Sequence, residues 1–329
     1  MKLLVTGASG DIGTRLITRL INSKSENEGL ELYTTDIKPL TVSKPNSNSS
    51  GVKSLDHKQC DIRSDELHHW IESIKPDVIV HLASIVQLPE AMKLEEAFDI
   101  DVNATERLLD IASKTGVGKF VVTSSGAAYG YWPDNPEWID ENLPVRGNDD
   151  YFYSKHKKHI ENLLLRFREN YPHLKQVVLR PGTVLGPNFS NPITNLFTKK
   201  RITGIAGSDS PFVIIWVDDL VEYLVESIHS NIEGVFNVAG DGALTLPQIA
   251  KILNKPFIAV PAYLVKTFLA IGKVLKLTQY GPEQVKFIQY RPVLSNKKIK
   301  RVFKHQPSKT TYEAFSDFLA ASDKEYVKQ

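Results

Sequence analysis

Two overlapping tyrosine–lysine pairs have the residue types and the spacing for proton transfer. Tyr151 and Lys155 are four residues apart, and so are Tyr153 and Lys157. Each pair would share one face if the segment is a helix. A free tyrosine has a pKa of about 10 and is a poor base at neutral pH, but a nearby ammonium group favours the phenolate. Such a pair can take the proton of an alcohol.

Helical periodicity favours the second pair. The apolar positions that follow it, at spacings of four and three, are Ile160, Leu164 and Phe167. Tyr153 and Lys157 continue this stripe toward the N-terminus at the same spacings. We therefore predict that Tyr153 and Lys157 face the interior and that Lys155 is a solvated charge, with Tyr151/Lys155 as the alternative.

A glycine-rich turn at the start of the chain is suited to binding phosphate. The sequence Thr6-Gly7-Ala8-Ser9-Gly10-Asp11-Ile12-Gly13 follows an apolar run and opens a helical pattern. Gly7 permits a tight turn, Gly10 lets the backbone approach a pyrophosphate, and Gly13 lets the helix pack closely on a sheet. The helix N-terminus adds free N–H groups and a positive dipole. We predict a dinucleotide site that includes Gly7, Ser9, Gly10, Asp11, Ile12 and Gly13.

An acidic residue indicates which dinucleotide binds. Asp36 ends the second apolar run, 23 positions after Gly13. A carboxylate there can accept hydrogen bonds from the adenosine ribose hydroxyls and repels a 2′-phosphate. This favours NAD over NADP, although Lys38 lies close by in the sequence and softens the preference.

The elements that must position these residues alternate between short apolar runs and amphipathic segments. The predicted strands are Lys2–Thr6, Glu31–Thr35, Asp77–His81, Lys119–Thr123 and Gln176–Leu179, and the predicted helices include Ile12–Leu20, Thr105–Ser113 and Tyr153–Arg168. This alternation predicts an α/β fold, a Rossmann-type doubly wound parallel sheet whose ligands bind at the carboxyl ends of the strands. We expect the nucleotide-binding domain to span residues 1–178. Residues 179–329 would form mainly a smaller, mixed substrate lobe, with segments near 213–238 returning to the first domain.

Composition excludes several classes of function. The 329 residues carry a net charge of +2, which gives no reason to expect nucleic-acid binding. Cys60 is the only cysteine, so an internal disulfide and a multi-cysteine metal site are excluded. The nine histidines show no convergent pattern of ligands, and we expect no metal. No apolar run reaches the length of a membrane span, and we expect a cytoplasmic protein.

Together these motifs resemble the extended short-chain dehydrogenase/reductase family, its NAD-dependent epimerase/dehydratase group. The resemblance covers nearly the whole chain and is clearest from Met1 to Pro187. Besides the glycine spacing, it rests on Cys60-Asp61-Ile62-Arg63, His81-Leu82-Ala83-Ser84 and Leu179-Arg180-Pro181-Gly182. The resemblance implies that Asp61 and Ile62 lie near the adenine, and that Leu82, Ala83 and Ser84 lie beside the cofactor. It also implies that Pro181 lies under the nicotinamide and that Asn103 supports the active site.

The same resemblance implies a catalytic serine. Thr123-Ser124-Ser125-Gly126-Ala127-Ala128-Tyr129-Gly130 resembles the end of the family's catalytic-serine strand. Counting back four residues from Tyr129 gives Ser125 in preference to Ser124. For the tyrosine–lysine pair the family pattern leaves both alternatives open. Many family members have a serine directly before the lysine, as Ser154 is before Lys155. A glutamate four residues after the lysine is also common, as Glu161 is after Lys157. With Ser125, Tyr153 and Lys157 as the catalytic group, the tyrosine removes a hydroxyl proton while hydride moves to the nicotinamide.

Departures from the family pattern bear on the substrate. Gly126 and Ala127 follow Ser125 where dehydratases of the family carry an acidic residue, which argues against sugar 4,6-dehydration. Arg291 is the candidate cation for a substrate diphosphate, and Asn188 is a further candidate for substrate contact, together with Ser84 and Ser125. We therefore expect an epimerase or oxidoreductase that acts on a nucleotide sugar.

Two other hypotheses remain open. One is an NAD(P)-dependent reductase or dehydrogenase of a non-sugar ketone or alcohol, which the apolar second half favours slightly. The other is a non-catalytic dinucleotide-binding sensor or assembly factor, because fold alone does not establish catalysis. By analogy with the family we expect a homodimer that forms through the helical regions Glu90–Ser113 and Tyr153–Arg168.

Overall fold

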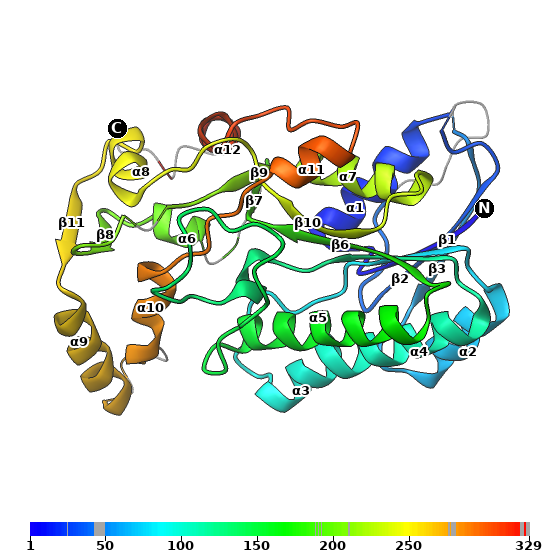
Figure 1. Cartoon of the computed structure of the whole chain (residues 1–329), viewed down its shortest axis with the longest axis horizontal. Helices are drawn as coiled ribbons and strands as arrows, with labels where there is room; N and C mark the ends of the chain where they lie inside the picture. Colours follow the sequence, from blue (N-terminus) through cyan, green and yellow to red (C-terminus); the bar gives the residue numbers. More distant parts are fainter. Residues whose placement is uncertain are drawn as a thin grey trace.

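A seven-stranded parallel sheet forms the centre of the structure. The computed structural model describes residues 1–24, 26–42, 50–187, 189, 191, 193–209, 211–275, 277, 281–322 and 326. The strand order is β10-β6-β5-β4-β1-β2-β3, and helices cover both faces (Figure 1). The predicted Rossmann-type, doubly wound fold is confirmed.

The strands of this sheet lie close to the predicted runs. They are β1 (Lys2–Thr6), β2 (Leu30–Asp36), β3 (Val52–Gln59), β4 (Val78–His81), β5 (Lys119–Thr123), β6 (Lys175–Pro181) and β10 (Gly234–Val238). The inner strands read as apolar runs because both of their faces are covered by helices. Edge strand β3 was not predicted: its sequence VKSLDHKQ is largely polar, and Val52 is its one buried residue.

Two groups of helices cover the two faces of the sheet. On one side lie α1 (Asp11–Asn22), α7 (Val217–His229) and α11 (Lys297–Val302), and on the other lie α2 (Asp65–Ile74), α3 (Leu94–Phe98), α4 (Ala104–Thr115) and α5 (Phe152–Asn170). A π-helical turn, η1 (Asp99–Asn103), joins α3 to α4. Each face has its own apolar core, so both groups of helices are held to the sheet by buried side chains.

A smaller mixed lobe lies beyond the carboxyl ends of the strands. Its elements are β7 (Thr183–Leu185), α6 (Thr194–Phe197), β8 (Ile202–Ile205), β9 (Ile214–Trp216), α8 (Leu246–Ile252), β11 (Phe257–Val260), α9 (Ala262–Val274), η3 (Pro282–Gln284), α10 (Val285–Gln289) and α12 (Thr311–Ala321). β7 pairs with β9, and β8 pairs with β11. A separate core that includes Phe197, Phe212, Phe315 and Phe318 stabilises the lobe.

The chain passes between the sheet and the lobe more than once. β6 crosses the expected boundary between residues 178 and 179, and β10 returns from the lobe to pair in parallel with β6. The division into two domains therefore stays a prediction. Among the described residues, the helices are too short or too polar to cross a bilayer.

Candidate active site

Three side chains meet at the carboxyl end of β5 and the start of α5. Ser125 follows β5 and precedes the short helix η2 (Gly126–Tyr129), where its Oγ accepts a hydrogen bond from the Ala127 N–H at 3.1 Å. Ser125 and Tyr153 share a side-chain hydrogen bond. The Lys157 ammonium lies 5.5 Å from the centre of the Tyr153 ring. The structure thus brings together the three predicted catalytic residues.

Lys157 is held in place by two acceptors. Its Nζ donates to Ser84 Oγ at 3.1 Å and to the Thr123 carbonyl at 3.2 Å, and the residue is only 3% exposed. Burial lowers the pKa of Lys157, while the carboxylates of Asp101 and Glu161 act in the opposite direction. The ammonium is therefore positioned by the ends of β4 and β5 rather than by solvent.

The side chain of Tyr153 is a protonated phenol in this environment. Burial raises its pKa to about 12, and the hydrogen bond with Ser125 opposes that rise. At neutral pH the phenol is therefore protonated. Acting as a base requires further positive charge beside the ring, which favours the phenolate.

The alternative pair is divided between two environments. Tyr151 lies just before α5 and contributes to the wall of the cavity described below. Its ring packs 4.3 Å from the Phe287 ring and 5.9 Å from the Tyr131 ring. Lys155 is partly exposed on α5 and lies outside that cavity.

Ser124, the less favoured serine, belongs to a buried polar network. Its Oγ donates to Glu161 at 2.6 Å, and Glu161 also accepts from Arg180 Nε at 2.8 Å. Arg180 Nη1 donates to the Tyr129 hydroxyl at 2.6 Å, and burial raises the pKa of Tyr129 to about 12. The Ser124 hydroxyl is therefore committed to Glu161, whereas the Ser125 hydroxyl faces Tyr153.

One cavity of about 430 Å³ joins the glycine turn to these residues. It is lined by the predicted dinucleotide residues Gly7, Gly10, Asp11, Ile12, Gly13, Leu82, Ser84 and Pro181. Gly7 has a φ of +69°, and a Cβ there would lie 2.5 Å from the Ala83 nitrogen. A Cβ on Gly13 would lie 2.3 Å from the Gly7 carbonyl oxygen. The turn therefore requires glycine at both positions.

The N-terminus of α1 opens into this cavity. Gly10 precedes the helix and carries no side chain that could cap its first N–H groups. Unpaired N–H groups at a helix start bind phosphate, and the dipole adds attraction. The residues present therefore fit the pyrophosphate of a dinucleotide.

Asp36 lies at the carboxyl end of β2, beside the glycine turn. Its carboxylate accepts from the backbone N–H groups of Ser9 and Lys38, each at 3.0 Å. The Ser9 hydroxyl donates to the Pro39 carbonyl at 3.1 Å. These bonds fix the carboxylate next to the turn, which is where a ribose ligand is expected.

The predicted adenine residues have partners within the chain. Both carboxylate oxygens of Asp61 accept from Arg63, at 2.7 and 2.9 Å, and this hydrogen bonding lowers the pKa of Asp61. Ile62 is buried in the core that contains α2 and α4. Ala83 lies against Gly7 and packs on the same core.

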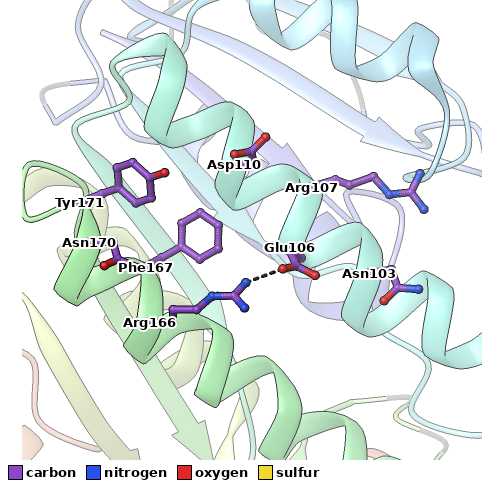
Figure 2. A pocket seen from close by; sticks show the side chains of 8 residues that line it. All are labelled: Asn103, Glu106, Arg107, Asp110, Arg166, Phe167, Asn170 and Tyr171. Atoms are coloured by element: carbon purple, nitrogen blue, oxygen red, sulfur yellow. Dashed lines mark hydrogen bonds and ion pairs between the residues drawn. The ribbon is translucent and has the colours of Figure 1, made fainter.

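Asn103 lies outside the cavity. Figure 2 shows it at one end of a surface groove between α4 and α5, which has a volume of about 590 Å³. Its amide donates to Asp99 Oδ1 at 3.0 Å, and an ion pair between Glu106 and Arg166 crosses the groove. The supporting role expected for Asn103 remains a prediction, and its contacts in the structure are with η1.

Asp101, two residues earlier, contacts the active site instead. It is 1% exposed. Its Oδ1 accepts from the Ile85 N–H at 2.8 Å, and its Oδ2 lies 2.8 Å from Nδ1 of His156. We did not predict this pair from the sequence. The available signal was an acidic residue two positions before Asn103, together with a histidine directly before Lys157.

Arg291 also lines this cavity. Its guanidinium lies 3.9 Å from the centre of the Phe212 ring, and burial lowers the pKa of Arg291. Within the described part of the chain, no carboxylate forms an ion pair with it. Phe189 and Asn191 also line the cavity, while the predicted contact Asn188 lies outside the described residues.

The fold and the site define an NAD-dependent enzyme class, and comparison with known proteins identifies the family. The profile of the NAD dependent epimerase/dehydratase family matches residues 3–239, and the chain belongs to this family. It is an enzyme with NAD as its cofactor, as the resemblance implied.

Individual relatives are distant in sequence. The chain is 29% identical to a UDP-glucose 4-epimerase of Mycolicibacterium smegmatis, over 69% of this chain and 73% of the relative. It is 30% identical to a GDP-6-deoxy-D-talose 4-dehydrogenase of Aggregatibacter actinomycetemcomitans, over 77% of this chain and 79% of the relative. The solved UDP-glucose 4-epimerase of Thermotoga maritima superposes with a TM-score of 0.71 at 20% identity, over 98% of both chains. That structure supports the fold.

Proposed function

We propose that this enzyme transfers hydride at a secondary alcohol carbon of a nucleotide sugar, with Ser125, Tyr153 and Lys157 as the catalytic group. The observation that carries the proposal is one continuous cavity. Its lining includes the glycine turn of α1, these three side chains and the partly buried cation of Arg291.

Each catalytic side chain has a distinct role in the proposal. Tyr153 Oη takes the proton of the substrate hydroxyl and gives it back when the keto group is reduced. Lys157 stabilises the phenolate by its charge. Ser125 donates a hydrogen bond to the same substrate oxygen and stabilises the charge that develops there. Bound NAD supplies a hydride acceptor for the carbon that carries the hydroxyl.

The remaining cofactor contacts follow from the position of each group. The first turn of α1 would hold the pyrophosphate, Asp36 the adenosine ribose, and Lys157 the nicotinamide ribose. Leu82, Ser84 and Pro181 would line the nicotinamide end, because they lie in the cavity between the turn and Tyr153.

Arg291 supports an anionic substrate. Arg291 is partly buried, and a cation withdrawn from water is costly unless a negative group compensates it. The described residues supply no carboxylate for Arg291. The diphosphate of a nucleotide sugar would provide that charge. The Thermotoga maritima structure contains UDP-glucose, which agrees with this substrate class.

The experiment is a screen of UDP-, GDP- and dTDP-linked sugars, followed by proton NMR of the sugar ring. We expect one sugar to be interconverted at a single carbon, with NAD found by mass spectrometry after denaturation of the enzyme. Arg291→Gln should raise KM for that sugar at least tenfold, and Arg301→Gln, at an exposed position of α11, is the matched control. Activity unaffected by Arg291→Gln would contradict the diphosphate assignment.

A dehydrogenase of a non-sugar alcohol is the second candidate. The aromatic rings of Tyr131, Tyr151 and Phe287 form one apolar wall beside Tyr153, and such a wall suits a ring system without hydroxyl groups. This candidate predicts net NADH formation and an exchangeable cofactor, whereas an epimerase shows neither.

We also propose a homodimer formed by α4 and α5. Both helices present polar and aromatic side chains to the groove in Figure 2, including Arg107, Asp110 and Tyr171. Light scattering of the full chain tests this expectation. A cytoplasmic location remains part of the proposal and is supported by the unpaired thiol of Cys60.

A further inference from the structure

Helix α9 exposes an unusual amount of apolar side chain. Phe268 is 73% exposed, Val274 is 81% exposed and Tyr263 is 67% exposed. Within α9, Gly272 is the one residue that is buried. Single exposed apolar residues are ordinary on a protein surface, but a contiguous group of them marks an interaction site.

The exposed residues form a face of the helix. Leu264, Phe268, Ile271 and Leu275 follow one another at spacings of four, three and four, and all are exposed, so they lie on one side of α9. The helix contacts η3 and α10. Figure 1 shows α9 next to α10 at the outer end of the lobe, away from the central sheet. Among the residues that the structure describes, the apolar face is therefore largely uncovered by the chain's own core.

The charged side chains of α9 are both basic. They are Lys266 and Lys273, which are seven positions apart and therefore share one side of the helix, opposite the apolar face. Residues 255–291 contain six basic side chains and one acidic side chain, Glu283. Glu283 pairs with Lys273 at 3.3 Å. A basic side opposite an apolar face is typical of helices that lie in the plane of a membrane surface.

The geometry points to a lipid bilayer with anionic headgroups as the occupant of this face: we propose that α9 docks the protein on such a surface, with its apolar side chains among the acyl chains. A second copy of the chain fits less well. Its α9 carries lysines and no acidic residue, so it offers these lysines no complementary charge, whereas anionic headgroups do.

Docking at α9 would also place the active-site cavity near the membrane. Helix α10 contacts α9 and carries Phe287, which packs 5.0 Å from the ring of Tyr131 in the cavity wall. The proposed lipid-binding surface is thus connected to the cavity wall through α10. The docking proposal itself does not depend on which substrate is used.

Sedimentation of the full chain with vesicles tests the proposal. We expect strong binding to vesicles of phosphatidylcholine with phosphatidylglycerol, and weaker binding to phosphatidylcholine alone. Lys266→Gln should weaken binding to the anionic vesicles about fivefold. The triple change Leu264→Gln, Phe268→Gln and Ile271→Gln should weaken binding to both kinds of vesicle more than tenfold.

The matched control is the double change Val302→Gln and Tyr312→Gln, at exposed apolar residues of α11 and α12. It should bind vesicles like the wild type. A second readout is Phe268→Trp, whose fluorescence should be quenched by brominated lipid, and this measurement does not require the triple variant to fold. Absence of vesicle binding by the wild type would overturn the proposal. So would vesicle binding retained by a folded triple variant, or light scattering that shows α9-dependent self-association without lipid binding.

Discussion

His156 and Asp101 form a buried hydrogen-bonded pair close to Lys157. The Nδ1–Oδ2 distance is 2.8 Å, and the two residues are 2% and 1% exposed. His156 directly precedes Lys157. Asp101 also accepts from the Ile85 N–H, next to Ser84, whose Oγ accepts from Lys157. The pair therefore connects α5 to the segment that follows β4, next to the Lys157 ammonium.

Breaking this pair should destabilise the protein. His156→Ser leaves the Asp101 carboxylate buried without its side-chain partner, and such losses cost about 3 kcal/mol. His159→Ser is the matched control, because His159 also packs on Phe98, with ring centres 5.4 Å apart. Urea unfolding should show a lower free energy of unfolding for His156→Ser and an unchanged one for His159→Ser. In a double-mutant cycle, adding Asp101→Asn should recover part of it, and simple additivity would contradict the coupling.

Tyr153→Phe should abolish turnover and preserve NAD binding. Removal of the hydroxyl deletes the proton acceptor, and proton transfer contributes roughly 10²–10⁴-fold to rate. Tyr151→Phe is the control, since it keeps the packing on Phe287. The measurements are kcat in the sugar assay and NAD affinity by calorimetry. If Tyr151→Phe is inactive while Tyr153→Phe is active, the alternative register is correct.

Lys157→Met should shift the pH dependence of alcohol oxidation. Burial raises the pKa of Tyr153 to about 12, and the Lys157 charge opposes the rise when the phenolate forms. Activity should therefore increase with pH as Tyr153 loses its proton. Without the ammonium, this rise should move to higher pH. Lys155→Met should leave the profile of kcat/KM against pH unchanged, and equal profiles for both variants would refute the assignment.

Asp36→Ala should narrow the preference for NAD over NADP. The carboxylate is fixed by Ser9 and Lys38 beside the turn, where it would bind ribose hydroxyls and repel a 2′-phosphate. We expect about a tenfold weaker Kd for NAD and tighter binding of NADP. Asp56→Ala, on the exposed face of β3, is the control. Unchanged affinities for both dinucleotides would show that Asp36 does not contact the ribose.

His81 should make the folded state sensitive to acid. It is buried between Thr6 Oγ1, at 2.7 Å, and Thr105 Oγ1, at 3.0 Å, and burial lowers its pKa from 6.5 to about 4. In the unfolded chain it gains a proton below pH 6.5, while in the folded chain it remains neutral down to about pH 4. Folding stability should therefore fall as the pH drops through this window, by about 3 kcal/mol in total.

The measurement for His81 is the unfolding free energy in urea between pH 7 and pH 4. His81→Gln should lose this part of the pH dependence, and His69→Gln, on the exposed side of α2, should keep it. Identical slopes for the two variants would show that His81 titrates normally in the folded state.

Sequence patterns predicted the parts of the fold in which local spacing is decisive. The inner strands were found because burial on both faces makes them apolar runs, and edge strand β3 was missed because most of its side chains are polar or exposed. The stripe that continues through Tyr153 and Lys157 predicted which face of α5 is buried. In the structure Lys157 is buried and Lys155 is partly exposed.

Long-range polar contacts had no such signal. Asp101 and His156 are 55 positions apart, and spacing along the chain does not show that two buried polar residues meet. Asn103 was selected by resemblance, and the structure places it on the groove between α4 and α5. The hydrogen bonds from Arg63 to Asp61 are local, between residues two positions apart, but the motif alone does not show that the two side chains bind each other.

The return of β10 to the central sheet limits how far the molecule can be treated as modular. A chain cut after residue 178 would lack β10 and the last three residues of β6. The remaining strands would present an open edge to solvent, and open edges promote aggregation. The nucleotide-binding half therefore cannot be exchanged between proteins as a contiguous cassette, and recombination within this fold must carry residues 234–238 along with the N-terminal half.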